Sequence, residues 1–81
     1  MNMNNWIPCK KELPKKWQVV LTYRIIKGKD CYEINWITTD GFGEATVWEN
    51  DEEWEKYDYP LHINDPRAAT HWQPLAPPKP D

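Results

Sequence analysis

Apolar and polar residues alternate in three consecutive segments of the chain, which is the pattern of half-buried β-strands. The segments are WQVVLTYRII at 17–26, CYEINWITT at 31–39 and EATVWE at 44–49. All three are rich in the β-branched and aromatic residues that strands favour. The short turns KGKD and DGFG separate them. Turns of this length join neighbouring strands as hairpins, so the pattern predicts an antiparallel meander.

The alternation also divides each strand into two faces. In the first segment, Val19, Leu21, Tyr23 and Ile25 share one face, and the other face carries Val20, Thr22 and Arg24. In the second segment, the apolar Tyr32, Ile34 and Trp36 alternate with the polar Glu33 and Asn35. This second segment is the clearest half-buried strand, and we expect its apolar face to be the buried one.

The segment NDEEWEKYDYP breaks the strand pattern and predicts a short helix over residues 51–58. Asn50 and Glu53 have the spacing of a capping box, and acidic residues fill the first turn, where the helix dipole favours them. Trp54 and Tyr57 are three residues apart and so would share a helix face. Pro60 would end the helix. The alternative is an acidic surface loop.

The two ends carry short apolar stretches that we expect to pair with each other. Trp6-Ile7 and the segment THWQPL are strand-like, but neither can cover a core alone. Side by side they would close the edge of the sheet, and Pro74 would end the last strand because proline has no N–H for the ladder. The prediction is an α+β fold at 1–76, a small antiparallel sheet of three long strands and short terminal strands with one short helix. Residues 77–81 would be a proline-rich tail.

That tail allows a second interpretation. Residues 74–79 match the pattern P-x-x-P-x-K, which would make the tail a docking peptide rather than the end of a clasp. The pattern is short and proline-rich sequence produces it easily, so we favour the clasp.

Composition narrows the class of protein. A chain of 81 residues has a small core, and six Trp, four Tyr and one Phe would fill it without disulfides. Cys9 and Cys31 form no disulfide framework, and the sequence has neither a signal-peptide pattern nor an apolar run long enough for a membrane helix. We therefore expect a cytoplasmic protein with free thiols and no membrane association.

Charge is unevenly spread along the chain. Residues 1–30 hold seven Lys or Arg against two acidic residues, whereas residues 31–81 hold three against eleven. The net charge of −3 argues against a phosphate backbone as partner. The lysines at 10, 11, 15 and 16 are read as a solvated loop, because they lack the interleaved aromatics of a nucleic-acid reader.

The two ends resemble a known family. Trp6-Ile7, Leu13-Pro14, Val19-Val20-Leu21 and HWQPLAPPKP at 71–80 follow the order and spacing of the small phage and prophage proteins called domain of unknown function 551. The resemblance covers both ends and leaves residues 27–69 to the pattern alone. It implies a phage or prophage origin, a bacterial host cytoplasm and no known activity. The family commonly has a small aliphatic residue where this chain has Cys9, which implies a core position.

Candidate catalytic and metal chemistry is weak. Cys9, Cys31, His62 and His71 lack the paired spacing of a structural zinc site, so no metal or other cofactor is expected. Either thiol could meet His71, but no local feature supports a lowered pKa. The sequence has no phosphate-binding loop or nucleophile elbow. We expect no enzyme.

Aromatic and acidic residues together give the one candidate binding segment. Trp6, Trp36 and Trp72 are expected in the core. The predicted surface site lies among carboxylates and consists of Trp48, Glu52, Glu53, Trp54, Glu55, Tyr57 and Tyr59. Trp and Tyr are enriched at interface hot spots, and the carboxylates would favour a partner with a basic surface.

Two functions fit these observations. The first is a small non-catalytic phage accessory protein that binds a host or phage protein, as an inhibitor of a host enzyme or defence component. The second is a module that holds a nucleotide or aromatic ligand in a Trp-lined pocket. Trp48 and Trp54 on a convex surface would favour the first, and the same residues converging in a hollow would favour the second.

Overall fold

The three long strands lie where the alternation predicts them. They are β2 (Val20–Ile26), β3 (Lys29–Thr39) and β4 (Thr46–Glu49). β2 pairs antiparallel with β3, and β3 pairs antiparallel with β4, which confirms the meander. Trp17 precedes β2 and does not begin it, because its backbone has a positive φ of 69°.

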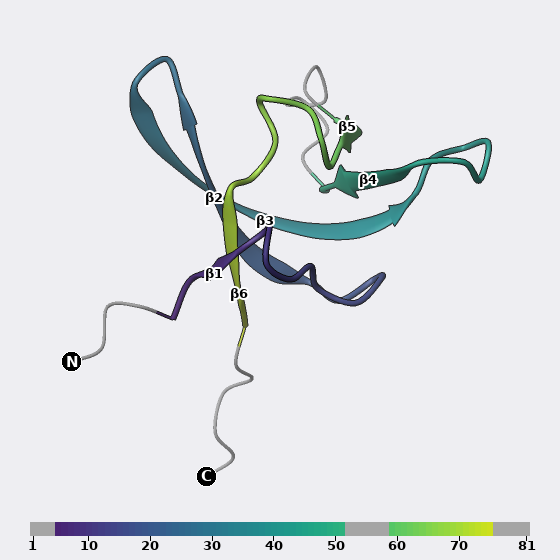
Figure 1. The fold of residues 1–81 in the computed structure, drawn as a ribbon, viewed down its shortest axis with the longest axis horizontal. Coiled ribbons are helices and arrows are strands. Elements are labelled where there is room, and N and C mark those ends of the chain that lie inside the picture. Colours follow the sequence, from purple (N-terminus) through teal and green to yellow (C-terminus); the bar gives the residue numbers. More distant parts are fainter. Residues whose placement is uncertain (1–4, 52–58, 76–81) are drawn as a thin grey trace, which may run out of the picture.

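The computed structural model describes residues 5–51 and 59–75, and its strands form one antiparallel sheet (Figure 1). Three short strands, β1 (Ile7–Pro8), β5 (Leu61–His62) and β6 (His71–Pro74), complete the order β1-β6-β2-β3-β4-β5. The predicted α+β class is therefore wrong, since the described residues form an all-β protein without a helix. The helix predicted for 51–58 falls at 52–58 outside the described residues, and Asp51 lies in a bend. Within the described ranges, no helix could cross a membrane.

Two local turns connect the meander. Lys27 and Gly28 have φ angles of 53° and 79°, so the β2–β3 hairpin has the left-handed pair of a type I′ turn. In the β3–β4 turn, Asp40 Oδ1 accepts the backbone N–H groups of Phe42 and Glu44, each at 3.0 Å. Those hydrogen bonds, that from Glu44 most of all, lower the pKa of the Asp40 carboxyl.

The two ends of the chain meet as the clasp predicts. β6 lies between β1 and β2, and Trp72 stands opposite both Ile7 and Thr22 in the register. Trp72 is 4% exposed, and its indole N–H donates to the Glu12 carbonyl at 2.8 Å. β6 ends at Pro74. The clasp is thus confirmed for the described residues, whereas the tail from residue 76 lies outside them.

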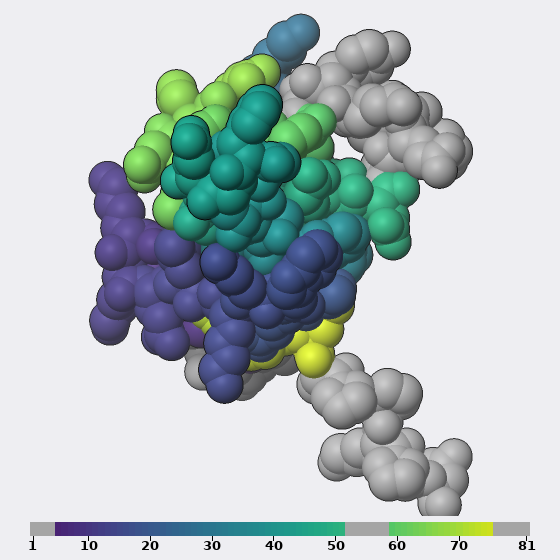
Figure 2. Space-filling view, turned by 90° about the vertical axis from the view of Figure 1, so that its right-hand side faces the viewer, coloured from purple at the N-terminus to yellow at the C-terminus, as the bar shows by residue number. Residues whose placement is uncertain are grey.

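One face of the sheet carries the core. The segment after β1 and the long loop from β5 to β6 lie over this face, the latter arching above β3 and β4 in Figure 1. The cluster of buried apolar side chains consists of Val20, Ile37, Trp48, Leu61, Ala68, Ala69 and Trp72. In Figure 2 the segment that leads into β2, in dark blue, lies directly below the β3–β4 turn, in teal. We call the side that bears this cluster the covered face.

The expectation about which face is buried is wrong. Asn35 on β3 is fully buried, whereas Tyr32 and Ile34 are 58% and 47% exposed. The covered face of β2 is the one with Val20, Thr22 and Arg24. A polar residue can be buried when it is hydrogen-bonded, and the polar groups on this face largely satisfy one another.

Candidate functional site

The side of the sheet opposite the covered face is unusually apolar along β2 and β3, and we call it the open face. By register it carries Leu21, Tyr23 and Ile25 from β2 and Tyr32, Ile34 and Trp36 from β3. Val19, Ile25, Tyr32 and Ile34 are all exposed. An antiparallel sheet with one solvated face normally places polar residues there. This face instead has the composition of a surface that another molecule covers.

Charge is sparse on the open face. Among the described strand residues that share it by register, none is Lys or Arg, and the two carboxylates are Asp30 and Glu49. Asp30 lies at the hairpin end of β3, and Glu49 stands opposite Trp36 near the other end. The face is therefore an apolar centre between two acidic positions.

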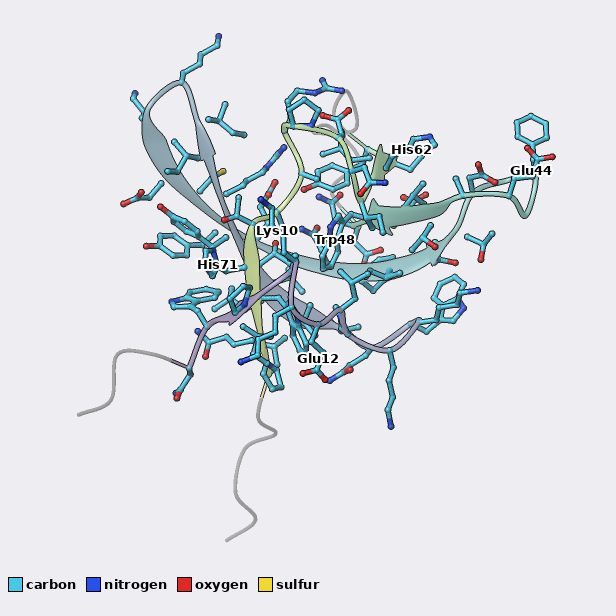
Figure 3. All side chains as sticks on the ribbon, in the orientation of Figure 1. Lys10, Glu12, Glu44, Trp48, His62 and His71 are labelled. Carbon is cyan, nitrogen blue, oxygen red and sulfur yellow. The ribbon has the colours of Figure 1, made fainter. Side chains whose placement is uncertain are left out.

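At one end of the open face, side chains from four strands or their flanks enclose a hollow of about 360 Å³. We call it the aromatic hollow, and its lining is Trp6, Pro8, Tyr23, Tyr32 and His71. The Tyr23 and Tyr32 ring centroids are 5.4 Å apart, and Trp6 lies 5.9 Å from Tyr23 and 6.1 Å from Tyr32. The His71 ring meets Tyr23 edge-on at 6.2 Å. In Figure 3, His71 lies to the left, clear of Trp48 at the centre.

Hydrogen bonds fix two of these rings. The Tyr23 hydroxyl donates to Asp30 Oδ1 at 2.8 Å, and this bond is the main cause of the raised pKa of Tyr23. His71 Nδ1 shares a hydrogen bond of 2.9 Å with Thr70 Oγ1. Because β2, β3, β6 and the residue before β1 hold the rings in register, the hollow is formed before any ligand arrives.

The covered face contains a buried polar network. Arg24 is buried and binds Glu33 through two contacts, Nε to Oε1 at 2.8 Å and Nη2 to Oε2 at 3.0 Å. Its Nη1 donates to the Arg67 carbonyl at 3.0 Å. Asn35 Nδ2 donates to Thr22 Oγ1 at 2.6 Å. The network ties the β2–β3 hairpin to the loop that precedes β6.

Tyr59, one of the predicted binding residues, belongs to this network. Its hydroxyl donates to Glu33 Oε1 at 3.0 Å and accepts from Asn35 Nδ2 at 3.3 Å. The Arg24 guanidinium lies 5.3 Å from its ring centroid. Burial, with the adjacent Glu33 carboxylate, raises the pKa of Tyr59, so the phenol stays protonated as a donor. Its hydroxyl is therefore committed inside the protein.

Trp48 corrects the sequence interpretation most directly. It is 1% exposed and packs in the core, so the expectation that it stands near the surface is wrong. Trp48 stands opposite Ile37 and Leu61 in the register, and this pairing turns its side chain to the covered face. The remaining predicted site residues are Glu52, Glu53, Trp54, Glu55 and Tyr57, which lie outside the described residues. Their role stays a prediction.

A second cavity of about 540 Å³ lies between residues 8–13 and 63–71. Cys9 lines it, and burial raises the pKa of the Cys9 thiol to about 11, which makes it a poor nucleophile. Cys9 packs against the core, as the family resemblance implies, and both Cys9 and Cys31 are free thiols. Within residues 5–51 and 59–75, no three His, Cys, Asp or Glu side chains gather as a metal site.

The sequence contained a signal for the open face that the strand-by-strand interpretation missed. Both faces of β2 carry residues that can pack in a core. On one of these faces, Arg24 lies diagonally across from Glu33 on β3 and pairs with it. A pair of opposite charges at such positions can satisfy itself within the sheet. Trp6 was expected in the core, but it is only half-buried and lines the hollow.

Comparison with known proteins gives a family and no activity. A family model described as "Protein of unknown function (DUF551)" matches residues 5–80. No curated protein and no solved structure matches the chain.

Proposed function

We propose that this chain, which belongs to the protein family of unknown function DUF551, is a non-catalytic binding protein that docks a protein partner on the open face of its sheet. The observation that carries this proposal is the exposure of apolar side chains on adjacent strands, with Tyr32 and Ile34 on β3 beside Ile25 on β2. These apolar side chains are in contact with water, and the surface of a second protein could cover them. Burial of such apolar area drives most protein association.

The chemistry of the partner follows from the surroundings of that face. An apolar centre calls for an apolar patch on the partner, and the acidic positions Asp30 and Glu49 favour basic residues around it. The predicted acidic segment at 51–58 would add to this charge. It would then steer a basic partner and need not form the contact itself.

The biological setting is part of the same proposal. The partner is a host or phage protein in a bacterial cytoplasm, and the chain acts on it as an inhibitor of a host enzyme or defence component. The resemblance of the two ends of the chain to small phage and prophage proteins is what supports this setting.

The test starts from a photo-crosslinking residue placed at Tyr32, with the same residue at Phe42 as the matched control. Phe42 is 87% exposed but belongs to the β3–β4 turn. A partner of the open face should crosslink from position 32 in bacterial cells and not from position 42. Mass spectrometry then identifies the partner for purification.

Binding of the purified partner is measured by calorimetry with Ile34→Asp and, as control, Phe42→Asp. A buried charge at the centre of an interface should weaken binding about tenfold or more, whereas the control should bind as the parent does. Phe42→Asp should change the unfolding free energy by less than about 0.5 kcal/mol, because Phe42 is 87% exposed in a turn. Ile34→Asp should cost about 1 kcal/mol in strand propensity, because Ile34 lies in β3 opposite Leu21, so urea unfolding first establishes that both variants are folded. Equal binding by Ile34→Asp and the parent would overturn the proposal.

The acidic segment has its own arm in this experiment. Reversing the charges of Glu52, Glu53 and Glu55 should slow association and leave the fold intact, if the segment steers a basic partner. An unchanged association rate would assign the charge preference to another part of the surface.

A second candidate is a small aromatic ligand or nucleotide in the aromatic hollow. The hollow is aromatic and its volume of about 360 Å³ lies within the roughly 300–1,000 Å³ of ligand pockets. Such pockets usually bury most of the ligand, however, and this one is a hollow on a sheet face. Titration with free nucleosides, followed by the indole N–H signal of Trp6, distinguishes this function from protein docking.

A further inference from the structure

The aromatic hollow has a more specific shape than the rest of the open face. Its three large rings are tilted against one another by 33° to 51°, so they line the hollow with an uneven apolar surface, on which Tyr32 is the exposed ring. Pro8 and His71 close the hollow at the side of β1 and β6. A rigid aromatic surface of this kind takes a ligand with matching ridges at little cost in conformational entropy.

Polyproline is the peptide conformation that fits such a surface. Its helix has a preformed ridge of pyrrolidine rings and no internal hydrogen bonds, so its carbonyls remain available as acceptors. Trp6 supplies an indole N–H and Tyr32 a phenolic O–H beside the apolar ring faces. Aromatic-lined grooves recognise proline-rich segments through this combination of ring packing and a few donors.

Charge selects among proline-rich segments. The carboxylate of Asp30 lies beside the hollow, since it accepts the hydroxyl of Tyr23 at 2.8 Å. Within the described part of the chain, no Lys or Arg forms an ion pair with Asp30. A basic side chain at one end of the ligand would form an ion pair with this carboxylate, which fixes the direction of the peptide.

We propose that the aromatic hollow binds an extended proline-rich segment of the partner protein, with a Lys or Arg of that segment paired to Asp30. This inference rests on the proposed docking function and names the chemistry of its partner. The chain's own tail is a poorer occupant, because β6 runs from His71 at the hollow to Pro74 opposite Val20. The last described residue, Leu75, therefore lies beyond the end of β6 that is farther from the hollow.

Nucleic acid is the competing macromolecule, because exposed rings on a sheet also stack on bases. Such surfaces combine the rings with Lys or Arg that track the phosphates. The described strand residues that share the open face with the hollow include no Lys and no Arg, and the Asp30 carboxylate would repel a phosphate. The charge on this face favours the peptide.

The experiment titrates the full chain with an oligoproline peptide ending in lysine and follows the indole N–H of Trp6 by NMR. The control peptides are the same oligoproline ending in glutamate and a Gly-Ser peptide ending in lysine. We expect saturable binding of the first peptide with a Kd below about 1 mM, weaker binding of the second and none of the third. A single-stranded oligonucleotide is a further arm.

Variants locate the binding. Tyr32→Ala should weaken the lysine peptide by about 2- to 12-fold, which corresponds to the loss of one aromatic contact. Asp30→Asn should remove the preference for lysine over glutamate and keep binding to proline. Phe42→Ala is the control and should bind as the parent does.

Several outcomes would overturn the inference. These are equal binding of the proline and Gly-Ser peptides, binding of the oligonucleotide in preference to both, or no effect of Tyr32→Ala. A chain truncated after Leu75 that binds the peptide far more tightly than the full chain would assign the hollow to the chain's own tail. If one of these outcomes is found while Ile34→Asp still weakens partner binding, the docking function stands without the proline-rich ligand.

Discussion

Trp72 joins the two ends of the chain, and replacing it with alanine tests the clasp. Its side chain is 4% exposed and lies opposite Ile7 on one neighbouring strand and Thr22 on the other. Its indole N–H also donates to the Glu12 carbonyl. The Trp72→Ala variant therefore loses packing on β1 and β2 together with a hydrogen bond to the segment after β1.

The expected cost can be estimated in two ways. A buried aromatic removes roughly 150–250 Å² from water, which at about 25 cal/mol per Å² gives roughly 4–6 kcal/mol as an upper bound. Measured truncations of buried Phe and Trp to Ala cost about 3–5 kcal/mol. A domain of this length has a total stability of about 4–12 kcal/mol. The variant should therefore lose a large part of its stability.

The assay is urea unfolding followed by circular dichroism. A milder variant, Trp72→Phe, keeps most of the ring and loses the hydrogen bond, so it should cost about 1–2 kcal/mol. The matched control is Trp17→Ala, because Trp17 is also a tryptophan but is 66% exposed. The control should change the unfolding free energy by less than about 0.5 kcal/mol.

The outcome that contradicts the reasoning is a Trp72→Ala variant that unfolds at the same urea concentration as the parent. The clasp would then contribute little, and β1 and β6 would be accessory strands. Loss of partner binding on removal of residues 77–81, with stability unchanged, would in that case favour the docking-peptide interpretation of the tail.

Three further predictions follow from the described contacts. Arg24→Met should lower the free energy of unfolding by about 3–5 kcal/mol, because it leaves the Glu33 carboxylate without its ion-pair partner. The double variant Arg24→Met with Glu33→Met should cost less than the sum of the two single variants, and additive costs in urea unfolding would contradict the pairing. Lys27→Asn places Asn-Gly in the type I′ turn and should stabilise by about 0.5–1 kcal/mol, so a lower melting temperature would argue against that turn. In a Cys31→Ser background, Cys9 should react with iodoacetamide at pH 8 about a hundredfold more slowly than an ordinary thiol, because its pKa is raised from 9.0 to about 11, and fast labelling by mass spectrometry would exclude that shift.

The raised pKa of Cys9 also makes the stability of the fold depend on pH. Its folded pKa lies above its unfolded value, so the protonated thiol favours the folded state at pH below about 9. That contribution should be lost as the pH rises from 9.0 through about 11. Unfolding of the parent and of Cys9→Ala across this range would measure it.

The sequence by itself determined the strands and their connections. Alternation located β2, β3 and β4, and Gly28 and the turn at Asp40 marked the hairpins, because these signals depend on residues close in the chain. The short apolar stretches at the two ends of the chain also predicted that they pair with each other, since neither could bury its apolar surface alone. The predicted α+β class is wrong, because the described residues form an all-β sheet, whereas the helix predicted for 51–58 falls at 52–58 outside them.

Only the tertiary structure decided which face of the sheet is buried. Alternation shows that a strand has two different faces, but the covering segments decide which of them meets the core. Here residues 9–14 and the loop before β6 cover the side with Arg24 and Asn35, whose hydrogen bonds make burial acceptable. That choice buried Trp48, placed Tyr32 in the solvent, and assembled the aromatic hollow from residues that are distant in sequence. The hollow depends on the register of four strands, and no local pattern encodes it.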